Sequence, residues 1–188
     1  MFLEPQAKKG WIEVVCGSMF SGKTEELIRR LKRAQIANQR VRIFKPAIDT
    51  RYDTQKIVSH DANSIASLPL QRAADIWDLS ANIDVVGIDE AQFFDLDLTN
   101  VCERLALHGT RVNVAGLDMD YLGKPFGPMP YLLSVAEYIT KLHAICVKCG
   151  QLATHSYRRP ATDSHAQIEL GSTDRYEARC RVCYTEHA

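Results

Sequence analysis

"WIEVVCGSMFSGKTEELIRR" (residues 11–30) contains the strand, the turn and the helix start that decide the fold. The apolar run "WIEVVC" (11–16) predicts a short buried strand. Apolar residues spaced among charged ones then predict a helix over 23–38. A strand that leads through a glycine-rich turn into a helix is typical of an α/β domain.

The turn between these two elements fits the phosphate-binding pattern G-x-x-x-x-G-K-[ST] in full, with Gly17, Gly22, Lys23 and Thr24 at the specified positions. The glycines allow backbone N–H groups to surround phosphate oxygens, and the helix N-terminus adds the positive end of its dipole. Lys23 would reach the β- and γ-phosphates, and Thr24 would offer its hydroxyl to Mg²⁺. A chance glycine turn is the alternative, and the flanking strand and helix argue against it. We place the intervening residues in the ATP site as well: Ser18, Met19, Phe20 and Ser21.

The rest of the chain alternates strand-like and helix-like segments, which favours right-handed βαβ crossovers and a parallel sheet. The polar stretch 46–64 lacks periodicity and predicts a long loop. Near residue 143 the pattern changes to short segments that carry four of the six cysteines, so we expect a P-loop α/β domain at 1–142 and a small cysteine-containing domain at 143–188. Further strands are predicted at 41–45, 84–90, 111–118 and 138–147, and helices at 73–80, 96–109 and 131–136.

Composition argues against several classes of protein. The 188 residues include 23 Lys+Arg and 23 Asp+Glu, so the formal net charge is zero and no broad surface for nucleic acid is expected. No stretch approaches the roughly 20 apolar residues that span a bilayer, and the N-terminus lacks the apolar region of a signal peptide. We therefore expect a cytoplasmic protein with no membrane partner, whose six cysteines are reduced thiols or metal ligands.

Two adjacent carboxylates end the predicted strand "DVVGIDE" (84–90). Asp89 fits the acid that holds Mg²⁺ beside a phosphate-binding loop. Glu90, whose side chain we expect to point away from that of Asp89, fits a general base for an attacking oxygen. A solvated residue at a strand end is the alternative for Glu90. An ATPase would activate water and a kinase would activate a substrate hydroxyl, and position alone does not separate the two.

Two C-x-x-C pairs lie near the C-terminus: Cys146, Cys149, Cys180 and Cys183. Each pair can place two thiolates on one turn around a tetrahedral Zn²⁺, and the 30 residues between the pairs would form a tethered loop that closes over a substrate. Buried or free thiols are the alternative, and His187 is a substitute ligand that four cysteines make unnecessary. Cys16 and Cys102 lie inside apolar patterns and are predicted core residues.

A set of motifs over residues 10–184 closely resembles the zinc-containing cytosolic thymidine kinases: "GSMFSGKT", "DTRY", "IDEAQFF", "GLDMDYLGKPFG" and the C-terminal C-x-x-C pairs. The resemblance implies phosphorylation of the 5′-hydroxyl of thymidine, and of deoxyuridine, by ATP with Mg²⁺. It implies a RecA-like P-loop sheet with helices on both faces and a zinc-tethered lasso loop. It also implies a homotetramer that thymidine triphosphate inhibits.

The resemblance carries roles to individual residues. It makes Glu90 the catalytic base, supported by Lys23, and Arg51 of "DTRY" an arginine near the phosphates that offsets charge in the transition state. A solvated loop arginine is the alternative for Arg51, and Asp49 would help the metal shell. Thr24 and Asp89 would hold Mg²⁺. The ATP site would also include the residues of the acidic motif: Asp89, Glu90, Ala91 and Gln92.

The resemblance also predicts a nucleoside pocket. Met19 would face the base, so the phosphate-binding loop would touch both substrates. Without the resemblance, Phe93, Leu117 and Phe126 would equally fit an ordinary core, and Gln92 could contact base or ribose. The wall around thymine would consist of Phe93, Leu117, Tyr121 and Phe126, and the lasso would add Ser156, Gly171 and Tyr176.

Some positions depart from the family pattern. Tyr121 stands where many relatives have Phe, and the stretch 157–170 matches poorly, which bears on substrate preference and on the register of Ser156. A second function that the motifs allow is a P-loop ATPase with a zinc ribbon for nucleic acid, and the neutral charge counts against it. A non-catalytic nucleotide-binding regulator fits less well, because the full set of chemical groups is present.

Overall fold

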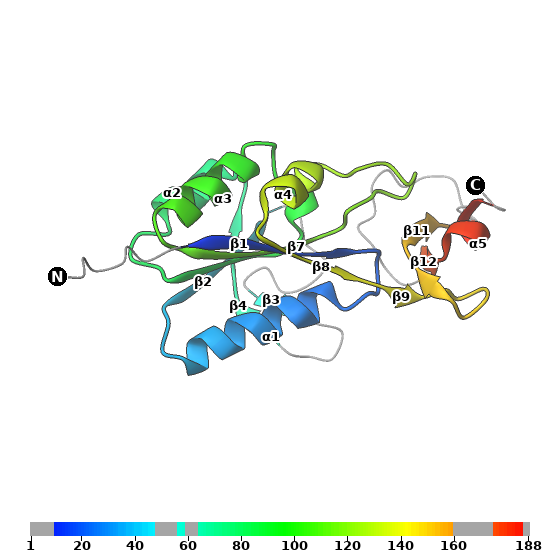
Figure 1. The fold of residues 1–188 in the computed structure, drawn as a ribbon, viewed down its shortest axis with the longest axis horizontal. Helices are drawn as coiled ribbons and strands as arrows, with labels where there is room; N and C mark the ends of the chain where they lie inside the picture. The colour runs from blue at the N-terminus through cyan, green and yellow to red at the C-terminus, as the bar shows by residue number, and fades with distance from the viewer. Residues whose placement is uncertain (1–9, 48–55, 59–63, 160–174, 186–188) are drawn as a thin grey trace, which may run out of the picture.

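The computed structural model describes residues 10–47, 56–58, 64–159 and 175–185, which form a layered α/β sheet and a small C-terminal unit (Figure 1). Six strands, all parallel, form the main sheet in the order β5–β2–β6–β7–β1–β8. These strands are β1 (Trp11–Gly17), β2 (Val41–Pro46), β5 (Leu68–Leu70), β6 (Val85–Ile88), β7 (Arg111–Gly116) and β8 (Tyr138–Leu142).

Helices cover both faces of this sheet (Figure 1). On one face, Leu27 and Leu31 of α1 pack in a buried cluster with Val15 of β1. On the other face, Leu98 of α3 packs in a second cluster with Val14, the neighbour of Val15 on β1. The predicted α/β class with helices on both faces is therefore confirmed. The helices are α1 (Lys23–Ile36), α2 (Ala74–Asp78), α3 (Leu98–Leu107) and α4 (Met129–Val135).

The strand order brings the two predicted halves of the nucleotide site to one edge of the sheet. β7 lies between β1, which ends at Gly17, and β6, which ends one residue before Asp89. Because the strands are parallel, their C-terminal ends meet at the same edge, where ligands of α/β sheets bind. The phosphate-binding loop and the acidic pair therefore lie at that edge.

Three strands end earlier than the sequence pattern predicts, and the one expected over 111–118 ends at Gly116. The strand expected over 84–90 ends at Ile88, because Glu90 has a left-handed backbone with φ 50° that a strand cannot continue. The segment expected as one strand over 138–147 divides at His143, and its second part pairs in a different sheet. An apolar run predicts a buried segment, but it does not show where the chain leaves one sheet and begins to pair in another.

Several short strands were not predicted. β3 (Lys56–Val58) lies within the stretch 46–64 that was predicted as a loop, and it pairs with β4 (Ser64–Ala66). β5 adds a parallel edge beside β2. Each of these strands has three residues, which is too few to show a periodicity in the sequence. They are recognised only by the hydrogen-bonded pairing with their neighbouring strands.

The C-terminal unit contains two antiparallel pairs and a short helix. Ala144, Cys146, Ala153 and Ala178 form its small buried cluster, and Phe20 of the phosphate-binding loop packs against that cluster. Because β8 ends at Leu142 and β9 begins at Ala144, we propose to keep the division into 1–142 and 143–188. Its elements are β9 (Ala144–Ile145), β10 (Leu152–Ala153), β11 (His155–Arg158), β12 (Tyr176–Arg179) and α5 (Arg181–Thr185).

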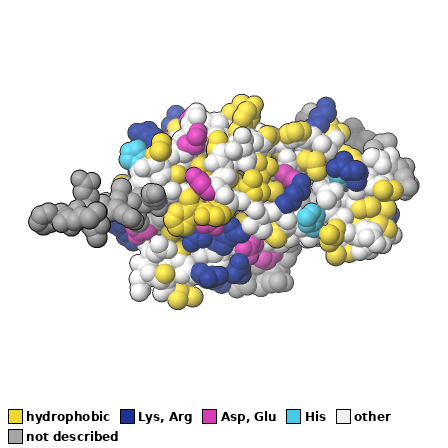
Figure 2. Space-filling model, in the orientation of Figure 1, with side chains coloured by type: hydrophobic (Ala, Val, Ile, Leu, Met, Phe, Trp, Pro, Cys, Tyr) yellow, Lys and Arg dark blue, Asp and Glu magenta, His cyan; other side chains and the backbone are white. Residues whose placement is uncertain are grey.

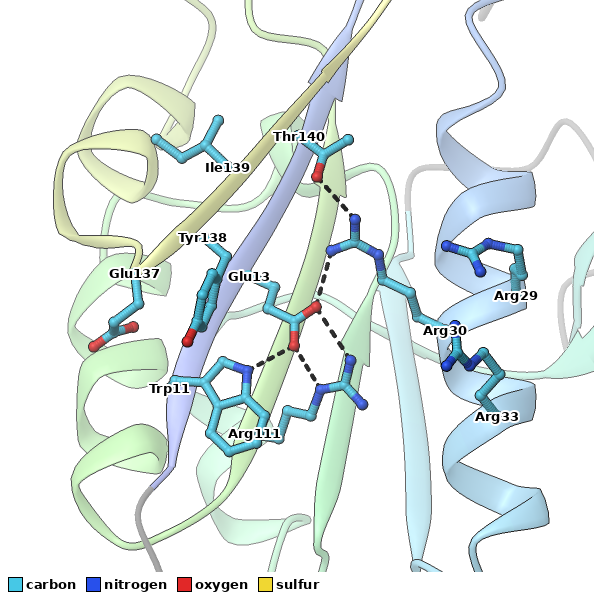
Figure 3. Close-up of a pocket in the computed structure, with 10 residues that line it drawn as sticks. All are labelled: Trp11, Glu13, Arg29, Arg30, Arg33, Arg111, Glu137, Tyr138, Ile139 and Thr140. Carbon is cyan, nitrogen blue, oxygen red and sulfur yellow. Dashed lines mark hydrogen bonds and ion pairs between the residues drawn. The ribbon is translucent and has the colours of Figure 1, made fainter.

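A groove of about 780 Å³ lies between α1 and the edge strand β8 (Figure 3). It is lined by the first residues of β1, β7 and β8, which are Trp11, Arg111 and Tyr138. The groove therefore lies toward the sheet edge opposite the phosphate-binding loop. Its polar side chains form a network that ties α1 to the sheet.

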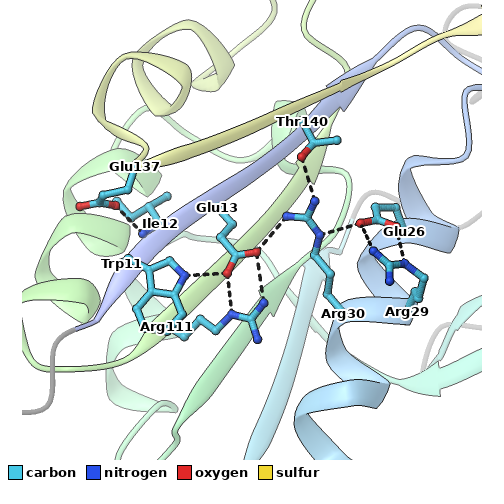
Figure 4. A network of polar contacts seen from close by, with 9 residues as sticks. All are labelled: Trp11, Ile12, Glu13, Glu26, Arg29, Arg30, Arg111, Glu137 and Thr140. Carbon is cyan, nitrogen blue, oxygen red and sulfur yellow. Dashed lines mark hydrogen bonds and ion pairs between the residues drawn. The ribbon is translucent and has the colours of Figure 1, made fainter.

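Glu13 is the centre of this network (Figure 4). Its Oε1 accepts hydrogen bonds from Arg111 Nε and Trp11 Nε1, both at 2.6 Å, and its Oε2 accepts one from Arg30 Nη1 at 2.9 Å. Burial alone would raise the pKa of Glu13, but the donors of Arg111 and Trp11 and the charge of Arg30 hold it below its ordinary value of 4.5. The network therefore stabilises the ionised carboxylate.

A Glu13→Gln variant is expected to lose about 2 kcal/mol of stability, because it leaves the partly buried guanidinium group of Arg111 without its carboxylate and leaves Arg30 with only its pair to Glu26. This loss corresponds to a melting temperature about 5 °C lower for a domain of this size. Since the folded pKa is depressed, the contribution is fully present above pH 4.5 and is lost as the pH falls through the folded pKa. Thermal melts at pH 7 and pH 3 measure both effects. The exposed Glu103→Gln is the control, and equal melting of both variants at pH 7 would contradict the prediction.

Candidate active site

The phosphate-binding loop follows β1 without a break. Gly17 has φ 146°, and a Cβ on it would lie 2.2 Å from the carbonyl oxygen of Leu142, so this position accepts glycine alone. Gly22, with φ 82°, precedes the first residue of α1. The backbone thus has the sharp turn that the glycine pattern predicted, between a buried strand and a helix N-terminus.

Lys23 is held inside this loop. Its Nζ donates a hydrogen bond to the carbonyl oxygen of Ser18 at 2.7 Å. Burial lowers the pKa of the Lys23 ammonium, and the carboxylates of Glu90 and Asp89 oppose that shift. The negative charges of both acids therefore act on the Lys23 ammonium. A phosphate oxygen placed beside the ammonium would favour its charged form in the same way.

Thr24 and Asp89 face each other across the gap between α1 and the end of β6. The Thr24 hydroxyl donates toward the Asp89 carboxylate oxygens at 3.3 and 3.4 Å. Asp89 is buried, and its backbone N–H is tied to Phe44 of β2. A hydroxyl and a carboxylate are the hard oxygen ligands that Mg²⁺ prefers, so this pair fits the predicted metal position.

Glu90 adopts a conformation that the sequence pattern did not predict. Its left-handed backbone, with φ 50° and ψ 40°, precedes the 3₁₀ turn η1 (Ala91–Phe93). Because β6 ends at Ile88, strand alternation does not govern these two residues, and the divergence of the Glu90 and Asp89 side chains stays a prediction. A left-handed backbone at a residue other than glycine is strained, and such strain is concentrated at functional sites.

Asp118 is a third carboxylate at this edge, which sequence reasoning did not identify. It follows β7 by two residues, is buried, and pairs with Lys141 Nζ at 2.6 Å. Burial and the Asp118 charge raise the pKa of the Cys16 thiol to about 11, so Cys16 stays protonated, as a core residue should. The signal for Asp118 was available in the acid that ends the apolar run "RVNVAGLD" (111–118).

The residues predicted to contact thymine occupy two places. Phe93 and Phe126 lie edge to face with ring centroids 5.5 Å apart. Phe93, Leu117 and Phe126 are only partly buried, which suits the wall of a pocket better than a core. Tyr121 is more exposed, and its carbonyl oxygen accepts a hydrogen bond from the Tyr184 hydroxyl at 2.8 Å.

The lasso residues are described in part. Ser156 of β11 is buried, and its Oγ accepts a hydrogen bond from the backbone N–H of Met19 at 3.0 Å. Tyr176 is partly buried and lies opposite Arg158 in the pairing of β11 with β12. The lasso therefore begins on a hairpin that contacts the phosphate-binding loop. Four predicted residues lie outside the described part of the chain: Asp49, Arg51, Gly171 and His187.

A Ser156→Ala variant is expected to lower kcat/KM for thymidine about 10-fold, because it leaves the partly buried N–H of Met19 without its acceptor. The loop would then hold Met19 less firmly relative to β11. Steady-state kinetics measure the effect. Ser156→Thr keeps the hydroxyl and is the matched control, so equal losses in both variants, or none in Ser156→Ala, would contradict the role of this hydrogen bond.

The four cysteines of the C-x-x-C pairs come together as predicted: their sulfur atoms all lie within 4.8 Å of one another. Cys149 Sγ and Cys180 Sγ are 3.6 Å apart. Four sulfurs at about 2.3 Å from a central Zn²⁺ lie about 3.8 Å apart, so the cluster fits a tetrahedral zinc site. Cys102 is fully buried in the α3 core, and burial raises the pKa of its thiol.

This combination defines a class of protein. A parallel sheet presents a phosphate-binding loop, a lysine and an acidic pair at one edge, and a four-cysteine metal site holds a hairpin against that loop. These are the features of a P-loop α/β nucleotide-binding protein with a structural zinc site. In the part of the chain that the structure describes, no helix has the length and apolarity required to cross a membrane.

Comparison with known proteins identifies the family. A family model described as thymidine kinase matches residues 10–184. The chain is 59% identical over 182 residues to a thymidine kinase of Bacteroides fragilis (strain YCH46), covering 97% of this chain and 90% of the relative. It is 60% identical over 175 residues to a thymidine kinase of Rhodothermus sp. (strain ITI 518), covering 93% and 81%. The chain belongs to the thymidine kinase family.

Proposed function

We propose that this protein transfers the γ-phosphoryl group of ATP to the 5′-hydroxyl of thymidine, and of deoxyuridine, to make the monophosphate for DNA synthesis. The observation that carries the proposal is the convergence of Lys23, the Thr24–Asp89 pair and Glu90 beside the Phe93–Phe126 wall, in a chain of the thymidine kinase family. These groups supply a phosphate donor site and an acceptor site side by side.

The loop would bind the donor. Its N–H groups and the ammonium of Lys23 would hold the β- and γ-phosphates at the N-terminus of α1. Thr24 and Asp89 would hold Mg²⁺, which supplies positive charge that screens the phosphate oxygens during transfer. The remaining residues of the loop and of the acidic motif would line the ATP site. Arg51 would add charge stabilisation from the segment outside the described residues.

Glu90 would act on the acceptor. Its carboxylate would take the proton of the 5′-hydroxyl as that oxygen forms a bond to the γ-phosphorus, while the bond to the β–γ bridging oxygen breaks and ADP leaves. Met19 and the aromatic wall would hold the base, and Ser156, Gly171 and Tyr176 of the lasso would cover it. A covered site excludes water and so prevents hydrolysis of ATP.

Further properties are carried by family membership and remain part of this proposal. We infer a cytoplasmic homotetramer that thymidine triphosphate inhibits, because the end product would occupy the nucleoside site and reach toward the phosphate-binding loop. A nucleic-acid partner is not part of the proposal. On the face shown in Figure 2, basic and acidic side chains are interspersed, as expected for a formal net charge of zero.

Labelled ATP with a panel of nucleosides tests the proposal. We expect labelled monophosphate from thymidine and deoxyuridine, no product from purine nucleosides, and ADP release that depends on the nucleoside. Equal ATP hydrolysis with and without thymidine would overturn the proposal and favour a P-loop ATPase.

A further inference from the structure

Gln92 is enclosed by protein on every side. The residue is 2% exposed, although the neighbouring Phe93 is only partly buried. Its Nε2 donates a hydrogen bond to Glu90 Oε2 at 2.5 Å, and its Oε1 accepts one from the backbone N–H of Leu117 at 2.9 Å. Both ends of the amide are therefore engaged within the protein.

The partners determine the orientation of this amide. A backbone N–H can only donate, so the amide end that faces Leu117 must be the oxygen, and the nitrogen must face Glu90. A flipped amide would direct N–H against N–H at Leu117 and oxygen against carboxylate at Glu90. A Cβ on Gly116 would lie 2.9 Å from Gln92 Oε1, so the chain leaves room for the amide at this point. The donor to Glu90 is thus held in place by the end of β7.

Local backbone geometry brings Gln92 to Glu90. The chain bends here because Glu90 has a left-handed backbone and the 3₁₀ turn over Ala91–Phe93 follows directly. In this turn the Phe93 N–H donates a hydrogen bond to the Glu90 carbonyl oxygen at 3.1 Å. The turn folds the side chain of residue 92 back toward that of residue 90. In a continuing strand, residues 90 and 92 would share a face but lie about 7 Å apart.

We propose that Gln92 is a positioning residue for the phosphoryl transfer: its amide donor holds the Glu90 carboxylate in the orientation in which that carboxylate takes the proton of the substrate hydroxyl. This inference rests on the proposed role of Glu90 as general base. A free glutamate side chain rotates about three bonds, and a fixed donor restricts it to the geometry that proton transfer requires. Because Leu117 holds the amide, Gln92 also links Glu90 to the segment that forms the wall of the proposed base pocket.

Two substitutions separate the parts of this contact. Gln92→Met is similar in size and removes both hydrogen bonds. Gln92→Glu keeps an oxygen that accepts from Leu117 but replaces the neutral amide donor with a second carboxyl group against Glu90. For both variants we expect kcat to fall about 10- to 50-fold, with KM for thymidine and for ATP within about 3-fold of the original enzyme. Gln35→Met, on the exposed face of α1, is the control and should retain full activity.

A double-mutant cycle with Glu90→Gln distinguishes positioning from structural damage. If Gln92 acts through Glu90, adding Gln92→Met to Glu90→Gln should lower the remaining kcat by less than about 3-fold. A structural defect would multiply with the first loss and keep its full 10- to 50-fold effect. Thermal melts of all four proteins show whether each variant is folded at the assay temperature.

The outcomes are distinct. Two results would overturn the positioning role while leaving the proposed function intact. One is an unchanged kcat in the Gln92→Glu enzyme. The other is a loss of kcat from Gln92→Met that is as large in the Glu90→Gln background as in the original enzyme. If Glu90→Gln itself keeps near-normal kcat, the general-base role fails, and the positioning role fails with it. A fall in kcat for both Gln92 variants, nearly absent in the Glu90→Gln background, supports the inference.

Discussion

A Glu90→Gln enzyme is expected to lose about 10³-fold in kcat, because an amide of the same size cannot accept the proton of the 5′-hydroxyl. The amide oxygen of the new side chain can still accept the hydrogen bond that Gln92 Nε2 donates to Glu90, so the side chain should stay in place. The loss in kcat would then reflect the missing proton acceptor and not a displaced side chain. Turnover of labelled ATP with saturating thymidine measures it.

ATP binding should survive this change. Lys23, Thr24 and Asp89 are untouched, and we expect Kd for Mg·ATP within about 3-fold of the original enzyme in an equilibrium titration. Glu103→Gln, an exposed carboxylate on α3, is the control and should leave kcat unchanged. A Glu90→Gln enzyme that binds ATP normally and retains more than about a tenth of kcat would contradict the assignment of the base.

Motifs formed by residues close together in the chain were predictable from the sequence. The glycine turn, the lysine and the threonine follow one another within eight residues, and each acts through its own backbone or a short side chain. The acidic pair follows an apolar strand directly, and the two C-x-x-C pairs each form one turn. Within each of these motifs the residues are neighbours along the chain, so each motif was recognisable without the strand order, although the two C-x-x-C pairs meet across a separation of 31 residues.

Contacts between distant segments were not predictable in the same way. Gln92 meets Leu117 because β6 and β7 are adjacent in the sheet, and Ser156 meets Met19 across 137 residues. The sequence predicted Gln92 as a site residue and gave no sign of its contact with Leu117. Its burial and its orientation depend on the strand order, which the alternation of elements leaves open.

Strand ends were also beyond sequence reasoning. The apolar run that leads into Asp89 gives no indication that Glu90 turns to a left-handed backbone, since non-glycine residues adopt that conformation only when their surroundings hold them. The hydrogen bond from Gln92 and the η1 turn are such surroundings. The error in the predicted strand end and the missed role of Gln92 therefore have one cause.

Loss of zinc is expected to abolish nearly all thymidine phosphorylation while the parallel sheet stays folded. Among the residues that the structure describes, the C-terminal unit has a buried apolar cluster of four residues, with Phe20 packed against it, which is too small to hold β11 and β12 without a metal. When it loosens, the contact of Ser156 with Met19 and the packing of Phe20 are lost together. Both contacts act on the phosphate-binding loop, so the active site loses its support although no catalytic side chain is removed.

Cys180→Ser tests this directly. We expect metal analysis to find about one zinc per chain in the original protein and far less in the variant. Activity should fall more than about 10²-fold, with most of the far-ultraviolet circular dichroism retained because the main sheet has its own core. Cys102→Ala, which changes a buried thiol outside the cluster, should keep both zinc and activity apart from a modest loss of stability. A Cys180→Ser protein without zinc that still phosphorylates thymidine at a normal rate would show that the loop does not depend on the tethered hairpin.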